Sequence, residues 1–198
     1  MQPTVASSEN DEPVLVRRLW PQERSLWEEH LLRLNREDRR LRFTGTTSDA
    51  AIRQHCAAAD FLDTVLYGAF IDGALRGVGE CCLLQREWPR RAELAFSVES
   101  RWRGLGIGTL LFGRLVTFAR NRTLGRLDLV TVSGNRPMQA IAARFGMHLN
   151  NDAGEVEGRL RLRWPSYSSV LEEAVAEGEA WWQQIRQDLP RCLPLACA

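Results

Sequence analysis

The chain has 198 residues, of which 44 % are apolar and 26 % are charged, as in an ordinary folded domain. This composition excludes a disordered or collagen-like chain, and no apolar run reaches the roughly 18–20 residues that span a bilayer. The formal net charge of +1 provides no general electrostatic attraction to nucleic acid or to a membrane surface, so neither is expected as a partner.

Three segments are expected along the chain. Residues 1–12 are polar and acidic, which predicts a flexible N-terminal tail rather than a secretory signal. Residues 13–165 carry the strand and helix patterns of the main domain, and residues 166–198 form a C-terminal helix and tail. The apolar stripe on that helix must be buried, either against the domain or in a homodimer contact.

The cysteine and lysine content indicates the chemical setting. The five cysteines are Cys56, Cys81, Cys82, Cys192 and Cys197. Their number is odd and no Cys-x-x-Cys pair occurs, so neither a disulfide framework nor a metal site is expected, and a reducing, cytoplasmic compartment fits best. All 26 basic residues are arginine. Codon usage in a GC-rich genome explains this most simply; a lysine-modifying enzyme that avoids labelling itself is the second explanation.

Hydrophobic periodicity, caps and turn residues predict the elements in chain order. First come a strand at 14–19, a helix opened by Pro21, a short helix capped by Asn35 and a helix over 49–59. Strands at 64–71, 75–84 and 92–98 follow, the first two joined by an Asp72-Gly73 hairpin turn. A helix from 107 to 119, a strand at 127–132, a helix over 137–145, two weak strands within 148–164 and a helix capped at Ser169 complete the chain. This order predicts an α/β fold in which helices pack on a mixed sheet.

The most informative segment runs from Phe96 to Thr109, where a predicted strand enters a glycine-rich turn and then a helix. Free backbone N–H groups at the start of a helix attract phosphate, and glycine lets the backbone approach the anion closely. Arg103 adds a charged donor at the same place, so the expected ligand carries a phosphate or pyrophosphate. A P-loop is excluded because the chain has no lysine, and the dinucleotide fingerprint fails because its third glycine would fall on Thr109.

The pattern Arg103-x-x-Gly106-x-Gly108 resembles the GCN5-related N-acetyltransferases, the GNAT family. The following strand at 127–132, then Asn135, then a helix that ends in Phe145-Gly146-Met147 are similar to the next elements of that family, and the resemblance spans about residues 14–164. It implies a mostly antiparallel sheet that splits like a V between the strands at 92–98 and 127–132. It also implies that acetyl-CoA is the cosubstrate and lies in the split.

The resemblance further implies which residues bind acetyl-CoA. The pyrophosphate would lie on the amides from Arg103 to Thr109, the pantetheine arm would pair with the strand backbone near Phe96 and Val98, and Asn135 would contact the cosubstrate from the other side. The implied set is Phe96, Ser97, Val98, Arg103, Gly104, Leu105, Gly106, Ile107, Gly108, Thr109 and Asn135.

Acetyl transfer to an amine requires a base, because a lysine-like amine has a pKa of about 10.4. Glu93 is the first candidate, since Ala92-Glu93-Leu94-Ala95-Phe96 is similar to the strand on which the family's histone and protein acetyltransferases carry a glutamate base. We expect its carboxylate to be half-buried; a solvated strand charge is the alternative. Glu80 on the preceding strand is the second choice, with an exposed strand residue as the alternative.

One position departs from the family pattern. Many members carry a tyrosine, as general acid to the thiolate, four residues before the glycine of the last motif, where this chain has Ala142. The thiolate then leaves unassisted, through water, or with the help of another donor. The departure also favours a second hypothesis, a non-catalytic acyl-CoA-binding regulatory or interaction module of the same fold.

The acceptor class rests on the segment from Leu31 to Phe43. It looks like the first helices of bacterial protein lysine acetyltransferases and ends in Leu41-Arg42-Phe43, as that subgroup does. A basic amphipathic helix with solvated arginines is the alternative. The expected function is therefore acetyl-CoA-dependent N-acetylation of a protein lysine or a small-molecule amine, the two acceptors being equal competitors because variable loops form the acceptor pocket.

Overall fold

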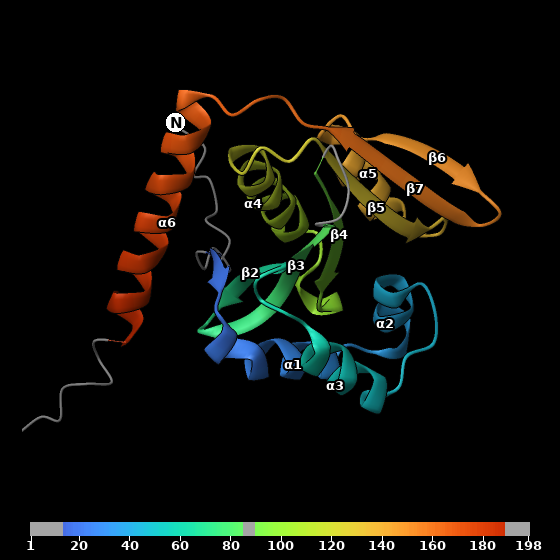
Figure 1. Ribbon diagram of the computed structural model, residues 1–198. Coiled ribbons are helices and arrows are strands. Elements are labelled where there is room, and N and C mark those ends of the chain that lie inside the picture. Colours follow the sequence, from blue (N-terminus) through green and yellow to red (C-terminus); the bar gives the residue numbers. More distant parts are fainter. Residues whose placement is uncertain (1–13, 85–89, 189–198) are drawn as a thin grey trace, which may run out of the picture.

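The structure, a computed structural model, describes residues 14–84 and 90–188 (Figure 1). The predicted tail at 1–12, Cys192 and Cys197 lie outside the described residues. The strands are β1 (Leu15–Leu19), β2 (Thr64–Ile71), β3 (Ala74–Leu84), β4 (Arg91–Val98), β5 (Arg126–Val132), β6 (His148–Asp152) and β7 (Glu155–Arg161). The helices are α1 (Arg24–Arg33), α2 (Arg36–Phe43), α3 (Asp49–Ala58), α4 (Ile107–Asn121), α5 (Arg136–Arg144) and α6 (Tyr167–Asp188), with 3₁₀ turns at Pro21–Glu23 and Ser100–Trp102.

Local signals place the element ends near the predicted positions. Asn35 Oδ1 accepts a hydrogen bond from the Asp38 amide at 2.8 Å and so begins α2. Asp72 and Gly73 have φ of +53° and +71°, the left-handed pair that a two-residue hairpin requires. The predicted cap at Ser169 is wrong by about one turn, because α6 begins at Tyr167 and the Ser169 amide donates a hydrogen bond to Ser166 Oγ.

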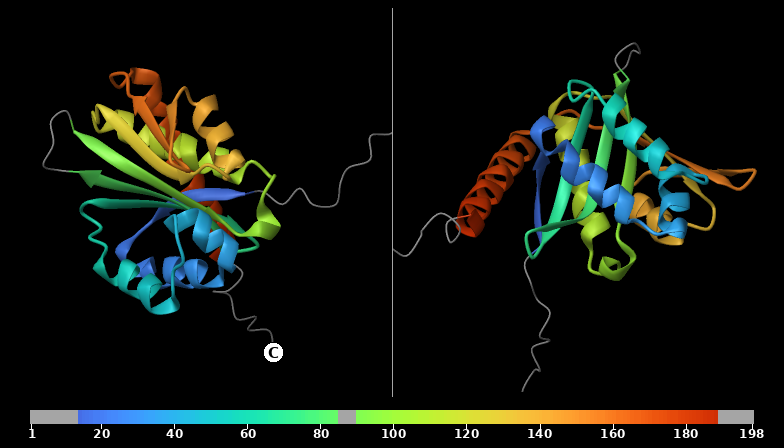
Figure 2. Two further views of the ribbon diagram at one scale, coloured as in Figure 1. Left: turned by 90° about the vertical axis from the view of Figure 1, so that its right-hand side faces the viewer. Right: turned by 90° about the horizontal axis from the view of Figure 1, so that it is seen from below.

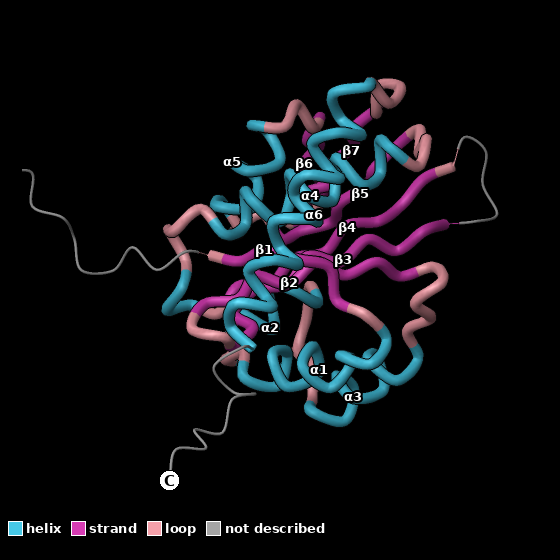
Figure 3. The backbone as a smooth tube through the Cα atoms, turned by 90° about the vertical axis from the view of Figure 1, so that its left-hand side faces the viewer, coloured by secondary structure: helices cyan, strands magenta, loops and turns pink. Residues whose placement is uncertain are grey.

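The strands form one seven-stranded sheet in the order β1-β2-β3-β4-β5-β7-β6 (Figure 3). Neighbouring strands are antiparallel except for β4 and β5, which are parallel. The predicted fold class, a mostly antiparallel mixed sheet with flanking helices and a C-terminal helix, is confirmed.

The pairing between β4 and β5 is short. It joins Arg91–Leu94 to Arg126–Leu129 and ends there. The pairing with the outer neighbours continues further: β4 stays paired with β3 as far as Val98, and β5 stays paired with β7 as far as Val132. The two halves of the sheet therefore separate after Leu94, which is the V-shaped split that the family resemblance implies.

Helices cover both faces of the sheet (Figure 2). On one face α4 packs with β4 and β5 around Leu94, Leu111, Phe112 and Leu129. On the other face α1 and α3 pack on β1 to β3, with Trp27 and Ile52 among the buried residues. Because side chains alternate along a strand, Leu94 of β4 faces α4 and Ser97 faces α1. The second face is the one that carries polar groups toward the split.

The C-terminal helix α6 packs on α4 and β1, one of the two arrangements that its apolar stripe predicts. Asn121 Nδ2 of α4 donates hydrogen bonds to the Ser169 carbonyl at 2.9 Å and to Glu173 at 2.6 Å. Leu171 and Trp182 remain exposed, at 64 % and 60 %. A homodimer contact through this outer surface stays a prediction.

Candidate functional site

A cavity of about 660 Å³ opens where β4 and β5 separate. Its wall comes from α2 and the residue Leu34 before it, the end of β4, the glycine turn with the 3₁₀ turn before it, the start of α4, and α5 with the loop that leads into it. The lining residues are Leu34, Glu37, Asp38, Leu41, Arg42, Phe96, Ser97, Val98, Trp102, Arg103, Gly104, Gly106, Ile107, Gly108, Thr109, Gly134, Asn135, Pro137, Met138 and Ile141. The structure therefore brings all but one of the residues implied to bind acetyl-CoA to one cavity; Leu105 is the exception, and its side chain is 57 % exposed.

The glycine turn presents bare backbone to this cavity. Gly104 and Gly106 have φ of +80° and +78°, and a Cβ built on either would meet no atom within 4 Å. Gly106 directly precedes α4 and no side chain caps the helix, so the first amides of α4 stay available to an anion. Gly108 has a different reason to be glycine: it lies inside α4, and its Cβ would come within 2.9 Å of Ile141 Cδ1. Gly108 thus permits close packing of α4 on α5.

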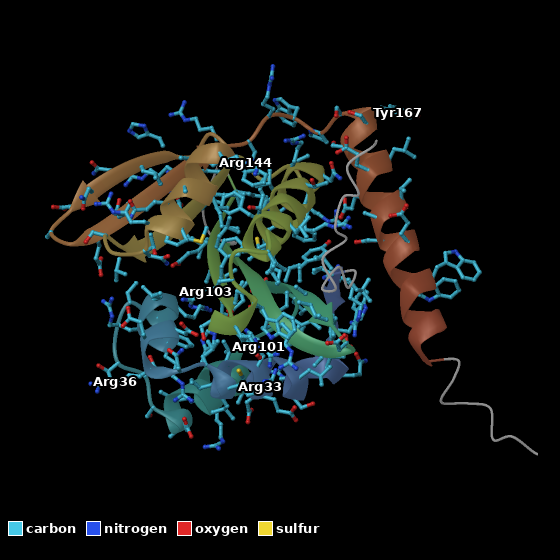
Figure 4. The ribbon with its side chains drawn as sticks, turned by 180° about the vertical axis from the view of Figure 1, so that it is seen from behind. Arg33, Arg36, Arg101, Arg103, Arg144 and Tyr167 are labelled. Atoms are coloured by element: carbon cyan, nitrogen blue, oxygen red, sulfur yellow. The ribbon has the colours of Figure 1, made fainter. Side chains whose placement is uncertain are left out.

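Arg103 joins three parts of the site (Figure 4). Its Nη2 contacts Asp38 Oδ1 of α2 at 2.5 Å, and its Nε donates to the Val98 carbonyl of β4 at 3.2 Å. Asp38 is only 5 % exposed. The sequence predicts that Arg103 binds the phosphate of the ligand, but it does not predict the contact with Asp38, because the two residues meet only in the folded chain.

The backbone of β4 offers hydrogen-bonding groups along the split. The Glu99 amide donates to the Arg76 carbonyl of β3, so Glu99 is a hydrogen-bonded partner of that strand. In an antiparallel pair such residues alternate, so Ser97 also points its peptide groups at β3 while Phe96 and Val98 point theirs the other way. The β4–β5 register ends at Leu94, and Phe96 and Val98 therefore face the cavity. These groups can pair with an extended amide chain, as a pantetheine arm requires.

Asn135 lies on the opposite side of the cavity, at the start of α5. Its Oδ1 accepts from the Met138 amide at 3.3 Å and its Nδ2 donates to Thr131 Oγ1 at 3.0 Å. Both ends of the side-chain amide therefore have partners within the protein. The contact between Asn135 and the cosubstrate stays a prediction, with helix capping as the role that the structure displays.

Glu80 is not the exposed strand residue that was the alternative for it. Its side chain is 1 % exposed and forms an ion pair of 2.6 Å with Arg42, a contact of 3.3 Å with His55, and a hydrogen bond of 3.3 Å from Trp27 Nε1. Burial raises the pKa of this carboxyl, but the charge of Arg42 and the hydrogen bonds from His55 and Arg42 outweigh burial and lower the pKa to about 2. Such a carboxylate holds Arg42 in the cavity wall and is a weak base.

Glu93 is exposed rather than half-buried. It lies on β4 between Cys82 of β3 and Asp128 of β5, within the stretch where β4 and β5 are still paired. Its side chain is on the same face of the strand as Ser97, four residues further along, which lines the cavity. Glu93 thus stands beyond the end of the cavity lining, and its role as base stays a prediction.

Neither tyrosine of the chain is among the residues that line the cavity. Tyr67 contacts Glu177 of α6 through its hydroxyl at 3.3 Å, and Tyr167 is 98 % exposed at the start of α6, well away from Arg103 (Figure 4). Ala142 is fully buried in α5. Thus no tyrosine from elsewhere in the chain takes the place of the family's general acid, which is missing at Ala142.

Known proteins resemble this chain over most of its length. The family model described as "Acetyltransferase (GNAT) family" matches residues 16–147. Acetyltransferase PA5475 of Pseudomonas aeruginosa is 26 % identical over 151 residues, 72 % of this chain and 78 % of that protein. The solved GNAT domain of S. lividans PAT has a TM-score of 0.64 at 19 % identity and covers 79 % of this chain and all of its own. RimL, a ribosomal L7/L12 alpha-N-protein acetyltransferase solved with coenzyme A, has a TM-score of 0.58 at 15 % identity, covering 76 % of this chain and 98 % of its own.

The chain therefore belongs to the GNAT acetyltransferase family, whose general activity is acetyl transfer to an amine. Members of the family bind acetyl-CoA. The cavity fits this cosubstrate, since it combines free amides at the start of α4, an arginine, and the unpaired edge of β4.

Within residues 14–84 and 90–188, no three His, Cys, Asp or Glu side chains gather into a group that could hold a metal ion. Over the same residues no helix combines the length and the apolar character needed to cross a membrane.

Replacement of Gly106 by alanine is expected to weaken coenzyme A binding about tenfold or more, because the methyl group would stand where the pyrophosphate approaches the amides. Gly73→Ala is the matched control: Gly73 has φ of +71° and open space around it, and it lies in the β2–β3 hairpin, outside the cavity lining. Both variants should lose about 1–2 kcal/mol of stability from the left-handed conformation. Calorimetric titration with coenzyme A decides; equal affinity in the two variants would remove the turn from the binding site.

Glu80→Gln is expected to lose about 3–5 kcal/mol of stability at neutral pH, because Arg42 is left buried without its partner. The pKa of Glu80 is lowered in the folded protein, so its stabilising effect is complete above the ordinary value of 4.5 and fades as pH falls toward about 2. Urea unfolding of the wild type and the variant should therefore converge in that range. Glu93→Gln, at an exposed position, should stay within about 0.5 kcal/mol of the wild type. A constant Glu80→Gln difference down to the lowest pH would contradict the ion pair.

Proposed function

We propose that this protein transfers the acetyl group of acetyl-CoA to the primary amine of a protein lysine or of a small molecule. The observation that carries the proposal is the edge of β4 at Phe96 and Val98, which lies free of β5 and ends at the amides of the glycine turn. An extended pantetheine arm on that edge places its pyrophosphate at the turn and its thioester toward Leu94, where the strands rejoin.

Glu93 lies at that end of the split and is our choice of base. Glu93 is exposed and shares a face of β4 with Ser97 of the cavity lining, so an amine that approaches the thioester along this face would pass Glu93. The Glu93 carboxylate takes the proton of the ammonium group, and the neutral nitrogen then attacks the carbonyl carbon. An outward-facing peptide N–H of β4, such as that of Phe96, can donate to the carbonyl oxygen as charge develops there.

The wall of α2 favours a protein acceptor. Leu41 and Arg42 of the Leu41-Arg42-Phe43 segment line the cavity, and Glu80 fixes the Arg42 guanidinium there. This is the segment that resembles the bacterial protein lysine acetyltransferases. RimL, by its name, also acts on an amine of a protein. Small amines stay the competing acceptor, and a panel that contains both kinds decides between them.

A non-catalytic acyl-CoA-binding module is the second candidate, favoured by the buried Ala142 and by the lack of a tyrosine in the cavity wall. Thiol release from acetyl-CoA in the presence of amines distinguishes the two. Because the chain has no lysine, any acetyl-lysine formed in such an assay belongs to the acceptor.

We also propose a cytoplasmic location. Cys56, Cys81 and Cys82 are free thiols. Burial raises the pKa of Cys56 and of Cys81 to about 12, so both stay protonated and unreactive. A chain that keeps adjacent thiols reduced on a central strand suits a reducing compartment.

Glu93→Gln is expected to lower turnover by about 10²–10⁴-fold at neutral pH while the affinity for acetyl-CoA stays unchanged. The rate should recover as pH rises toward the amine's own pKa of about 10.4, since the neutral nucleophile then forms without a base. Glu157→Gln is the control, because Glu157 is another exposed carboxylate on the same sheet. A Glu93→Gln enzyme with the turnover and pH profile of the wild type would remove Glu93 from the mechanism.

A further inference from the structure

We propose that Ser97 donates the proton that the departing coenzyme A sulfur takes up, that His30 replaces this proton, and that Glu99 positions His30. The inference rests on the proposed function and deepens it, since it assigns the general acid of the reaction. It uses residues of α1 and β4 that sequence analysis did not connect.

The three side chains form a chain of contacts that starts in the cavity wall. Ser97 Oγ lies 2.9 Å from His30 Nε2, and His30 Nδ1 lies 3.4 Å from Glu99 Oε1. Ser97 lines the cavity and His30 is completely buried behind it. The hydroxyl is therefore the only member of the three that belongs to the cavity lining.

The arrangement follows from the strand and from the helix above it. Ser97 points away from α4 because Phe96 and Val98 point toward it. On that side α1 covers the strand and places His30 over the hydroxyl. Glu99 lies two residues further on the same face of the chain and meets the other nitrogen of the ring.

Glu99 is held as a carboxylate. Arg33 Nε of α1 lies 3.0 Å from Oε1, and Arg76 Nη1 of β3 lies 3.1 Å from Oε2. Burial raises the pKa of Glu99, but the contacts of its carboxylate with His30 and Arg33 outweigh burial and lower the pKa to about 2. Among the ion-pair contacts of the described residues, Glu99 is the charged group that meets the His30 ring, and Arg33 and Arg76 in turn contact Glu99.

This geometry fixes which ring nitrogen gives up a proton. His30 Nδ1 has no hydrogen-bond partner among the described residues, and the nearest charge to it is the Glu99 carboxylate. A proton on Nδ1 is therefore stabilised, and the proton on Nε2 is the one that can leave toward Ser97. The arrangement is a donor relay that ends in the cavity.

The proton balance of the step is complete. When the amine nitrogen has attacked the thioester carbonyl it carries one excess proton, which passes to the exposed Glu93 carboxylate after Glu93 has released the first proton to solvent. The C–S bond then breaks and its electron pair stays on sulfur. Sulfur takes the proton of the Ser97 hydroxyl, and Ser97 takes the Nε2 proton of the His30 imidazolium. His30 is left neutral with its proton on Nδ1, and it regains the other from solvent through Ser97 once the cavity has emptied.

The histidine makes serine a usable acid. A hydroxyl alone is a much weaker acid than a thiol and cannot protonate a thiolate favourably. An imidazolium is by nature a stronger acid than a thiol, so a serine that draws its replacement proton from an imidazolium can protonate a thiolate. A purely structural role, in which the three groups only tie α1 to β4, predicts no effect on the sulfur.

The first test measures the ionisation of the coenzyme A thiol directly and needs no acceptor amine. The thiol of bound coenzyme A is titrated by its thiolate absorbance, with the complex of desulfo-coenzyme A as the blank. Donation from Ser97 stabilises the thiolate, so the bound thiol in the wild type should titrate about one pH unit or more below that in Ser97→Ala. Ser97→Thr keeps the hydroxyl and should restore the wild-type titration. An identical titration in the wild type and Ser97→Ala would overturn the proposal.

The second test reads the reaction. Ser97→Ala and His30→Gln should each lower kcat by about 10²-fold with little change in KM for acetyl-CoA. Calorimetric affinity for coenzyme A confirms that each variant is folded. Ser97→Ala with a wild-type kcat would overturn the proposal, as would an acetyl group found on Ser97 by mass spectrometry, which makes it a nucleophile. The absence of lysine keeps that measurement free of lysine self-acetylation.

The outcomes separate the relay from the proposed function. A wild type that lowers the thiol pKa of bound coenzyme A but acetylates no amine contradicts the proposed function and retains the Ser97 contact. A wild type that acetylates amines while Ser97→Ala behaves identically contradicts the relay alone.

Discussion

The separation of β4 from β5 after Leu94 is the constraint on which the site depends. Up to Leu94 the two strands satisfy each other's backbone groups. Beyond it, the peptide groups of Phe96 and the amide of Val98 stay available to a ligand, while the Val98 carbonyl accepts from Arg103 Nε. The close packing of α4 on α5 at Gly108 and the left-handed turn at Gly106 then place the helix amides at the open end of the same gap. A ligand with an extended amide arm and a pyrophosphate matches both features, and the GNAT family uses such a ligand.

The fold could be predicted because its signals are local. The Asp72-Gly73 turn, the Asn35 cap and the glycine run before α4 each act within a few residues, and each lies where the sequence predicts. The start of α6 was misplaced because serines at 166, 168 and 169 offer competing caps, and only the contact with Asn121 decides how Ser169 is used. The split itself came from the family resemblance, since nothing in a strand sequence states how long its pairing lasts.

The polar groups around the cavity could not be predicted in the same way. Ser97 and His30 are 67 residues apart, Arg103 and Asp38 are 65 apart, and Arg42 and Glu80 are 38 apart. Each pair forms only after α1 and α2 pack on the sheet. The carboxylates illustrate the consequence. Glu80, the second choice of base from the sequence, is a buried partner of Arg42, whereas Asp38 and Glu99, for which the sequence predicts no role at the cavity, contact Arg103 and His30.

Hydrogen exchange of the β4 amides tests the central claim most directly. Phe96 and Val98 should exchange rapidly in the free protein and slow markedly when coenzyme A is added, because their N–H groups then pair with the pantetheine arm. Ser97 and Glu99 are paired with β3 in both states and serve as the internal reference. Unchanged exchange at Phe96 and Val98 with saturating coenzyme A, or protection that appears only elsewhere in the chain, would contradict the assignment of the split as the binding site.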